Sequence, residues 1–375
     1  MLRIVADDKI PFLKGILEPF AGVTYIPGKD INREVAAGAD ALLIRTRTRC
    51  DASLLAGTPV KFIGTATIGY DHIDFGFCEN AGITWTNAPG CNASSVMQYM
   101  ASALISVSKE KKLSLEGKTL GIIGAGHVGS QVETLAGLLG MKVLLNDPPR
   151  ARREGCEKFT ELNRLLERSD FVTMHVPLTM AGDEKTYHLM DTVMIGMMKP
   201  DAWLINTSRG EVVDSAALDA ALSMGEIAGA ILDVWENEPK IDFELLRKVF
   251  IGTPHIAGYS ADGKANGTSR VVRALCAHFG LPLVSWYPEN LPEPLNNASI
   301  RINDLLTEDA AILHAILHTY DIRNDCTRLR ENPADFEKLR NYYPVRREFQ
   351  AYTVTGSNLK PAVKDKLVKL GFKVS

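Results

Sequence analysis

A glycine-rich turn between an apolar strand and a helical stretch most narrows the folds open to this chain. Gly124, Gly126 and Gly129 have the spacing G-x-G-x-x-G, directly after Leu120–Ile123 and before the helical stretch Ser130–Leu139. In such a unit the first glycine permits a tight turn, the second lets the backbone approach a pyrophosphate, and the third lets helix and strand pack closely. The helix N-terminus adds N–H groups that attract phosphate. The spacing therefore predicts a dinucleotide site in an α/β domain.

An acidic residue after the next predicted strand indicates which dinucleotide binds. Asp147 follows the strand Lys142–Asn146 and lies about 20 residues beyond the glycines, where an acid suits the ribose hydroxyls and repels a 2′-phosphate. This favours NAD over NADP. Arg150, Arg152 and Arg153 lie close by and could weaken the preference, but with Asp147 in place we favour a solvated basic loop.

Short apolar runs alternate with helical stretches through most of the chain, which is typical of parallel sheets. Strands are predicted at residues 2–6, 41–44, 60–64 and 83–86, and again at 118–123, 142–146, 171–175, 202–206, 228–232 and 249–251. Long helices are expected at 93–112 and 263–280, and a proline-rich linker at 286–294. Beyond it, helices are predicted at 307–320, 333–341 and 361–370, and strands at 347–355 and 372–375. We predict an α/β fold with two doubly wound parallel-sheet domains, Rossmann- or flavodoxin-like, and a small C-terminal α+β domain.

Composition excludes several classes of protein. Apolar residues make up 46% and charged residues 23%, which is ordinary for a globular chain and excludes general disorder. A net charge of −3 provides no basic footprint for nucleic acid, and the longest apolar runs are too short to predict a membrane span. The six cysteines form no C-x-x-C pair, and the N-terminus does not resemble a signal peptide. We therefore expect a reduced, cytoplasmic protein that binds neither nucleic acid nor membrane.

Three polar residues follow three successive predicted strands. Oxidising a 2-hydroxy acid requires a hydride acceptor, a base for the hydroxyl proton and a cation for the carboxylate. Arg209 can clamp a carboxylate through two parallel hydrogen bonds. An imidazole exchanges protons near neutral pH, so His255 can be the base, and the negative charge of Glu238 can hold its ring. Each residue alone has a simpler structural explanation, but their succession after a dinucleotide turn favours a dehydrogenase.

Arginines directly after the strand Ala41–Ile44 suggest where a phosphate binds. Arg45, Arg47 and Arg49 alternate, so they would share one side if the chain stays extended. Converging arginines at a strand end are suited to phosphate, although a solvated loop is equally compatible with any single one. We favour Arg45 and Arg47 over Arg49.

Histidines spaced i, i+4 raise the question of a metal. His314 and His318 lie on one predicted helix, with Asp321 and Asp325 beyond them. A polar helix face explains this spacing better than a metal site, and hydride transfer needs no metal.

The order of these motifs resembles the D-2-hydroxyacid dehydrogenase family. The resemblance rests on GAGHVG at 124–129, Asp147, NTSRG at 206–210, LDVWENEP at 232–239 and TPHIAGY at 253–259. It implies that Arg209, Glu238 and His255 are catalytic, with His255 as the proton donor or acceptor. It implies NAD contacts at Gly124, Gly126, His127, Val128, Gly129, Asp147, Val176, Thr207, Ser208, Arg209, Asp233 and Gly258. Val176 departs from the threonine expected after His175, so only a backbone contact could survive there. Thr46, Thr67 and Tyr259 match substrate positions, while His175 and His188 are expected to be structural.

The resemblance also implies a domain organisation and a narrower substrate. A discontinuous substrate domain spans 1–93 and 257–285, an NAD domain spans 94–256, and a C-terminal domain spans 286–375 and makes the chain a homodimer. Closure of the two larger domains would exclude water from the site. The stretches 64–74, 88–93, 146–150 and 255–259, with the C-terminal extension, match one branch of the family whose substrate is a phosphorylated four-carbon 2-hydroxy acid.

Two other interpretations remain open at this stage. One is a related enzyme acting on 3-phosphoglycerate; the other is a non-catalytic regulator that senses NAD(H) with the same fold. The intact Arg209, Glu238 and His255 argue against a sensor. The sequence does not tell whether NADH leaves after each turnover or is reoxidised in place by a 2-oxo acid.

Overall fold

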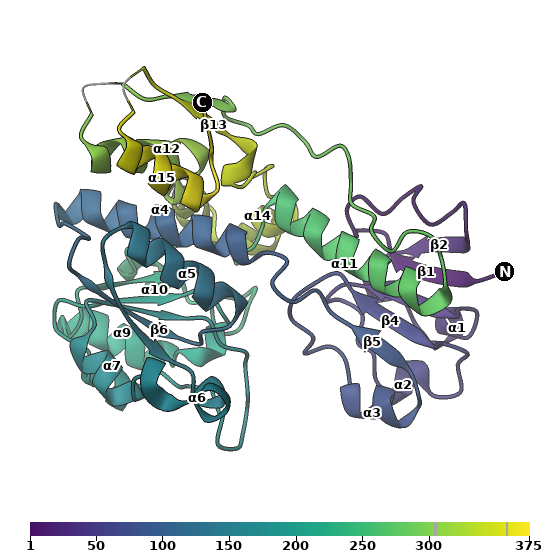
Figure 1. Cartoon of the computed structure of the whole chain (residues 1–375). Helices are drawn as coiled ribbons and strands as arrows, with labels where there is room; N and C mark the ends of the chain where they lie inside the picture. Colours follow the sequence, from purple (N-terminus) through teal and green to yellow (C-terminus); the bar gives the residue numbers. More distant parts are fainter. Residues whose placement is uncertain (304–305, 358) are drawn as a thin grey trace. The chain divides into compact units, whose positions relative to one another are not determined.

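A computed structural model describes residues 1–303, 306–357 and 359–375 (Figure 1). The described chain forms two compact units. The first comprises residues 1–92 and 260–292, and the second comprises residues 93–259 and 293–375. The first unit is thus built from two separate stretches of chain, and the predicted segments 1–93 and 257–285 lie almost wholly within it.

The first unit contains a five-stranded parallel sheet in the order β2-β1-β3-β4-β5. Its strands are β1 (Arg3–Asp7), β2 (Gly22–Ile26), β3 (Ala41–Ile44), β4 (Phe62–Thr65) and β5 (Thr84–Thr86). The side chains of β3 alternate between two cores, as the period of a strand dictates. Leu42 and Ile44 pack toward α1 (Arg33–Ala36), α2 (Ala52–Leu55) and α3 (Phe75–Asn80), whereas Ala41 and Leu43 pack toward α11 (Ala261–Phe279).

The second unit contains a six-stranded parallel sheet in the order β11-β10-β9-β8-β6-β7. Its strands are β6 (Thr119–Ile123), β7 (Lys142–Asn146), β8 (Phe171–Met174), β9 (Trp203–Asn206), β10 (Gly229–Leu232) and β11 (Ile251–Gly252). One face packs on α4 (Ala93–Lys111) and α5 (His127–Leu138). The other packs on α7 (Leu162–Arg168), α8 (Thr192–Gly196), α9 (Ser215–Met224) and α10 (Phe243–Lys248). A short helix, α6 (Pro148–Glu154), follows β7.

The C-terminal part has its own three-stranded sheet but shares the core of the second unit. Its elements are β12 (Ser299–Arg301), β13 (Thr353–Thr355), β14 (Lys373–Val374), α12 (Glu308–Thr319), α13 (Ile322–Glu331), α14 (Phe336–Asn341) and α15 (Pro361–Leu370). Figure 1 shows α12 beside α4, and α15 packs on α12 and α5. Buried Ile316, Ile322 and Leu367 belong to the core that contains α4. Residues 293–375 therefore fold onto the α4 side of the second unit rather than as a separate compact body.

Short 3-10 helices connect several of these elements: Gly28–Asp30, Cys156–Lys158, Gly210–Val212, Pro333–Asp335 and Phe349–Ala351. In the part of the chain that the structure describes, none of the helices is both long and apolar enough to cross a membrane. His318 Nε2 lies 2.8 Å from the carbonyl oxygen of Asn297, and the described residues include no cluster of three or more groups that could hold a metal ion.

One local prediction was wrong, and one edge strand was missed. The strand expected at Arg347–Thr355 shrinks to Thr353–Thr355, because Phe349–Ala351 forms a 3-10 helix. The edge strand β2 was not predicted, because its residues are at most half-buried and lack an alternating apolar pattern. The fold class itself is as predicted: two doubly wound parallel sheets and a small C-terminal α+β part.

Candidate active site

The glycine turn follows β6, which lies beside β8 at the point where the strand order of the sheet reverses. Doubly wound sheets bind ligands at this point. Gly124 has a φ of +89°, and a Cβ there would lie 2.5 Å from the carbonyl oxygen of His175. A Cβ on Gly129 would collide with the carbonyl oxygen of Gly124. Gly126, the N-cap of α5, is different, since a Cβ there would have no described atom within 4 Å. The turn thus keeps open space over the helix N-terminus, which suits a pyrophosphate.

Alanine substitutions should separate these two kinds of glycine. We expect Gly126→Ala to leave the free energy of unfolding almost unchanged and to raise the Kd of NADH about tenfold or more, roughly 1.4 kcal/mol. Gly129→Ala should instead destabilise the protein by about 1–3 kcal/mol, because its methyl group overlaps a backbone carbonyl. Denaturant unfolding and calorimetric NADH titration measure the two effects. Equal loss of stability in both variants would contradict the assignment of Gly126 to the cofactor.

Asp147 is fixed beside this turn by backbone hydrogen bonds. Its Oδ2 accepts from Ala125 N at 2.9 Å, and its Oδ1 accepts from Arg150 N at 3.0 Å as the N-cap of α6. The nearby arginines have acidic partners, since Arg150 pairs with Glu154 and Arg152 pairs with Glu184. These pairs offset the positive charge at the place where a 2′-phosphate would need it. The arrangement fits the ribose hydroxyls of NAD.

Other predicted cofactor residues border the same edge of the sheet. His127 is exposed and Val128 half-buried at the start of α5, and Val176 is half-buried after β8. His175 bonds Thr173 Oγ1 at 3.1 Å and Thr207 Oγ1 at 3.2 Å. Burial lowers the pKa of His175 to about 3, so its ring is neutral at pH 7. This is the behaviour of a structural histidine.

Arg209 stands in a tight loop after β9. Asn206 Oδ1 accepts from the backbone N–H and hydroxyl of Ser208, at 3.0 and 2.8 Å, and Arg209 Nη1 donates to Ser208 O at 2.8 Å. A Cβ on Gly210 would overlap the backbone of Trp235, so this loop lies directly against the loop after β10. The structure thereby brings the Arg209 loop against the segment that leads to Glu238.

His255 and Glu238 form a close pair. His255 Nδ1 lies 2.7 Å from Glu238 Oε2, and Trp235 N donates to Glu238 Oε1 at 3.0 Å. Burial raises the pKa of Glu238, but the hydrogen bond and charge of His255, the Trp235 N–H and the charge of Arg340 outweigh it, so that pKa lies below its usual range. Glu238 is therefore an anion at neutral pH and orients the imidazole. His255 is only partly covered, with a side-chain exposure of 27%.

Asp233 organises the loop that carries His255. Its buried carboxylate accepts from Thr253 Oγ1 at 2.6 Å, Ile256 N at 2.7 Å and Ala257 N at 2.8 Å. His255 N in turn donates to Asp233 O at 2.7 Å. The sequence predicted an NAD contact for Asp233 but not this second role, because the partners of its carboxylate lie some twenty residues further along the chain.

Tyr259 and Gly258 continue the same loop within the second unit. The Tyr259 ring meets the Tyr343 ring edge-on at 6.1 Å, and the Arg340 guanidinium lies 5.6 Å from the Tyr259 ring centre. Both partners belong to the C-terminal part, which contains no motif and therefore gave no signal that it would contact this loop.

The remaining predicted substrate residues lie in the first unit. Thr46 follows β3 and Thr67 follows β4, and since these strands pair in parallel, both residues lie at one edge of the sheet. Thr67 Oγ1 lies 2.7 Å from Thr65 Oγ1 and donates to Gly69 O at 3.0 Å. Arg45 Nη1 donates to Lys9 O at 3.4 Å. Arg45 follows β3 and Lys9 follows β1, and the strand order of this sheet reverses between these two neighbouring strands.

The extended geometry assumed for Arg45, Arg47 and Arg49 was wrong. The chain turns immediately after β3, with Thr48 N donating to Arg45 O at 3.3 Å. The three side chains therefore do not form one alternating row. Arg49 is exposed and pairs with Asp51 at 2.9 Å. Lys9, which the sequence did not single out, lies two residues beyond β1, the strand beside β3, and adds a cation at this edge that pairs with Asp8 at 3.5 Å.

Comparison with known proteins places this site in a family. Residues 93–257 match the model of the D-isomer specific 2-hydroxyacid dehydrogenase NAD binding domain, and residues 291–371 match a domain of unknown function. The chain belongs to the D-2-hydroxyacid dehydrogenase family and is an NAD-dependent dehydrogenase.

Individual relatives are more specific. An erythronate-4-phosphate dehydrogenase from Bacteroides fragilis is 49% identical over 354 residues, which are 94% of this chain and 99% of the relative. Another, from Proteus mirabilis, is 41% identical over 375 residues, which are 99% of each chain.

Two solved structures show the same fold with ligands. The D-lactate dehydrogenase of Aquifex aeolicus, complexed with NAD and lactic acid, is 28% identical with a TM-score of 0.61, over 74% of this chain and 95% of its own. NAD⁺-bound 3-phosphoglycerate dehydrogenase of Entamoeba histolytica is 25% identical with a TM-score of 0.63, over 78% of this chain and 99% of its own.

Proposed function

We propose that the protein oxidises 4-phospho-D-erythronate at C2 to 2-oxo-3-hydroxy-4-phosphobutanoate, as a step of pyridoxal 5′-phosphate synthesis. NAD, when bound at the glycine turn, supplies the hydride acceptor. The pair formed by His255 Nδ1 and Glu238 Oε2, 2.7 Å apart, is the observation that carries the dehydrogenase assignment. The choice of substrate is supported by relatives named erythronate-4-phosphate dehydrogenase that match nearly the whole chain.

His255 is the base in this proposal. Because Glu238 occupies Nδ1, Nε2 is the nitrogen that takes the proton from the C2 hydroxyl as the hydride leaves. The resulting imidazolium is stabilised by the Glu238 carboxylate, which is ionised at neutral pH. In the reverse direction the same nitrogen returns the proton to the 2-oxo oxygen.

Two cationic groups bind the ends of the acid. Arg209 clamps the C1 carboxylate through paired hydrogen bonds and so fixes C2 for hydride transfer. Arg45 and Arg47, with Thr46 and Thr67 at the same edge of the first unit's sheet, bind the 4-phosphate. Tyr259 adds a hydroxyl contact to the substrate. The C-terminal part makes the chain a homodimer.

The first experiment is a product measurement that does not depend on NADH release. Purified protein is incubated with 4-phospho-D-erythronate, with and without 2-oxoglutarate, and the 2-oxo product is measured by mass spectrometry. A parallel sample receives 3-phosphoglycerate. We expect product from the four-carbon acid alone. Product from 3-phosphoglycerate instead would assign the related activity, and no product from either acid with NAD bound would favour an NAD(H) sensor.

Arginine substitutions test the phosphate site. We expect Arg45→Met and Arg47→Met each to raise KM for 4-phospho-D-erythronate about 10- to 100-fold, since each removes a charge-assisted hydrogen bond of roughly 1.5–3 kcal/mol. KM for D-erythronate, which lacks the phosphate, should change less than about twofold. Arg49→Met is the control, because Arg49 is exposed and pairs with Asp51. Equal effects on both substrates would refute phosphate binding by these arginines.

A further inference from the structure

An arginine from the C-terminal part reaches the loop that carries the catalytic histidine. Arg346 is 5% exposed, and its Nη2 donates to Ile256 O at 3.1 Å and to Ala257 O at 2.5 Å. These two carbonyls belong to the residues directly after His255. One guanidinium nitrogen therefore holds two consecutive backbone groups of the active-site loop, from a point almost ninety residues further along the chain.

The N–H groups of the same two residues are held as well. Asp233 accepts the N–H groups of Ile256 and Ala257 at 2.7 and 2.8 Å. The Asp233 carboxylate thus binds the N–H groups of the segment after His255, and the Arg346 guanidinium binds its carbonyl groups. With both groups fixed, the backbone has little freedom to rotate and to carry the His255 ring away from Glu238.

The Arg346 side chain is itself fixed by an aromatic and acidic surround. Its guanidinium lies 4.5 Å from the Tyr320 ring centre and 5.8 Å from that of Tyr343. Both tyrosine hydroxyls donate to Asp325 Oδ2, at 2.9 and 2.7 Å. Burial raises the pKa of Asp325, although the two hydroxyls and the charges of Arg346 and Arg328 oppose this rise. The arginine is therefore sandwiched against rings that a buried carboxylate orients.

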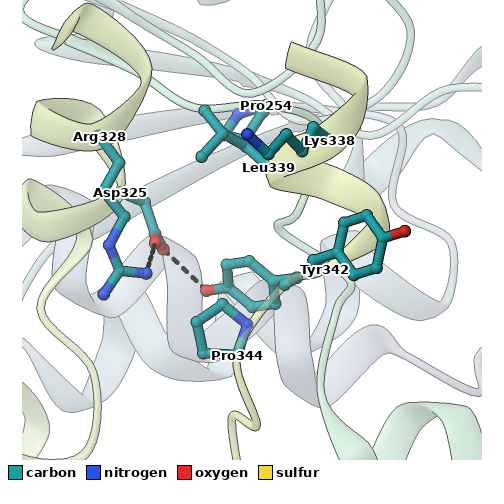
Figure 2. Close-up of a pocket in the computed structure, with 8 residues that line it drawn as sticks. Pro254, Asp325, Arg328, Lys338, Leu339, Tyr342 and Pro344 are labelled. Carbon is teal, nitrogen blue, oxygen red and sulfur yellow. Dashed lines mark hydrogen bonds and ion pairs between the residues drawn. The ribbon is translucent and has the colours of Figure 1, made fainter. Parts of the chain in front are cut away.

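Packing alone does not hold the loop on this side. A cavity of about 180 Å³ lies between Pro254, the residue before His255, and the side chains of Asp325, Tyr343 and Pro344 (Figure 2). Figure 2 shows the Asp325 carboxylate at the edge of this space, bonded to Arg328 and to a tyrosine hydroxyl. Where side chains leave a gap, the hydrogen bonds from Arg346 carry more of the positioning.

The hydrogen bonding of Arg346 also argues against a purely stabilising role. Among the described residues, its buried Nε and Nη1 atoms have no hydrogen-bond partner. Burying a guanidinium costs free energy that burying an apolar side chain of similar size would not. The contact is therefore better explained by the geometry it imposes on the loop than by a net gain in stability.

We propose that Arg346 is a positioning residue for His255, so that the C-terminal part completes the active site of its own chain. The inference rests on the proposed function, in which His255 exchanges the substrate proton. It assigns the C-terminal part a role besides the predicted dimerisation. Tyr259, on the same loop, contacts Tyr343 and Arg340 of the same stretch, so residues 340–346 support the loop at two points.

Arg330 provides a control with the same hydrogen-bond pattern, on an exposed rather than a buried side chain. Its Nη2 also donates to two consecutive carbonyls, Val249 O at 2.5 Å and Phe250 O at 3.2 Å, before β11 rather than after it. Arg330→Met removes the same chemistry without touching the His255 loop. We expect Arg346→Met to lower kcat about 10- to 100-fold, the effect of a misplacement of about 1 Å, while the Kd of NADH stays within about twofold. Arg330→Met should lower Tm and leave kcat unchanged.

Arg346→Lys keeps the experiment informative if Arg346→Met folds poorly. Lysine retains the positive charge but not the planar guanidinium with its several donors. We therefore expect a kcat between those of wild type and Arg346→Met when all three are measured well below Tm. Equal kcat for Arg346→Met and Arg330→Met would overturn the inference, as would a kcat loss matched by an equal loss of NADH binding. An inactive wild-type protein would instead overturn the proposed function, so the two failures are distinguishable.

Discussion

His255→Asn should lower kcat for 4-phospho-D-erythronate by about 10²- to 10⁴-fold and leave NADH binding intact. The range is that of a lost general base, because the amide cannot take the hydroxyl proton from C2. Asparagine is chosen because the backbone of His255 has a φ of +56°, which asparagine tolerates better than most residues. Single-turnover product formation and NADH titration measure the two quantities.

The chain offers a second histidine–carboxylate pair as a control for this substitution. His188 Nε2 lies 2.7 Å from Glu236 Oε1, and its backbone also has a positive φ, +50°. His188→Asn therefore removes a pair of the same length from the same kind of backbone, outside the proposed catalytic set. We expect reduced stability and nearly unchanged kcat. A similar kcat loss in both variants, or loss of NADH binding in His255→Asn, would assign His255 a structural role.

Arg209→Met should lower kcat/KM by about 10²- to 10⁴-fold. The substrate carboxylate would lose two charge-assisted hydrogen bonds, each worth roughly 1.5–3 kcal/mol, and most of the change should appear as a higher KM because the carboxylate keeps its charge throughout the reaction. Steady-state kinetics with trapping of the 2-oxo product provide the measurement.

Two further variants make the test of Arg209 specific. Arg209→Lys should give an intermediate value, since an ammonium group supplies charge but not the planar fork. Arg247→Met, which removes an exposed arginine paired with Glu244 in α10, should behave as wild type. If Arg209→Met also behaved as wild type, the carboxylate would have to bind elsewhere.

Much of the fold could be predicted from local pattern. The apolar runs at 41–44, 171–175 and 202–206 coincide with β3, β8 and β9 to within one residue. Strands buried on both faces are continuously apolar and stand out against the helices around them. The edge strand β2 is only partly covered, so its composition did not distinguish it from a loop.

The candidate site was predictable where it depends on a turn or on a strand end. Glycine spacing placed the cofactor turn, because Gly124 adopts a positive φ and Gly129 packs against the carbonyl of Gly124, only five residues away. Order along the chain suggested that Glu238 and His255 meet, and the structure brings them within 2.7 Å. The arginines after β3 were predicted to share one side because the backbone was assumed to be extended. The backbone instead turns at Arg45–Thr48, so the three side chains do not alternate along one row.

The sequence by itself determined the alternation of strands and helices, the glycine turn with its acidic partner, and the candidate residues at the strand ends. These follow from steric and hydrophobic rules that operate between near neighbours. Only the tertiary structure decided that Asp233 accepts the N–H groups of Ile256 and Ala257 and that Arg346 donates to the carbonyls of the same two residues. Such contacts join residues far apart in the chain, and their hydrogen bonds depend on how whole elements pack, so no local pattern records them.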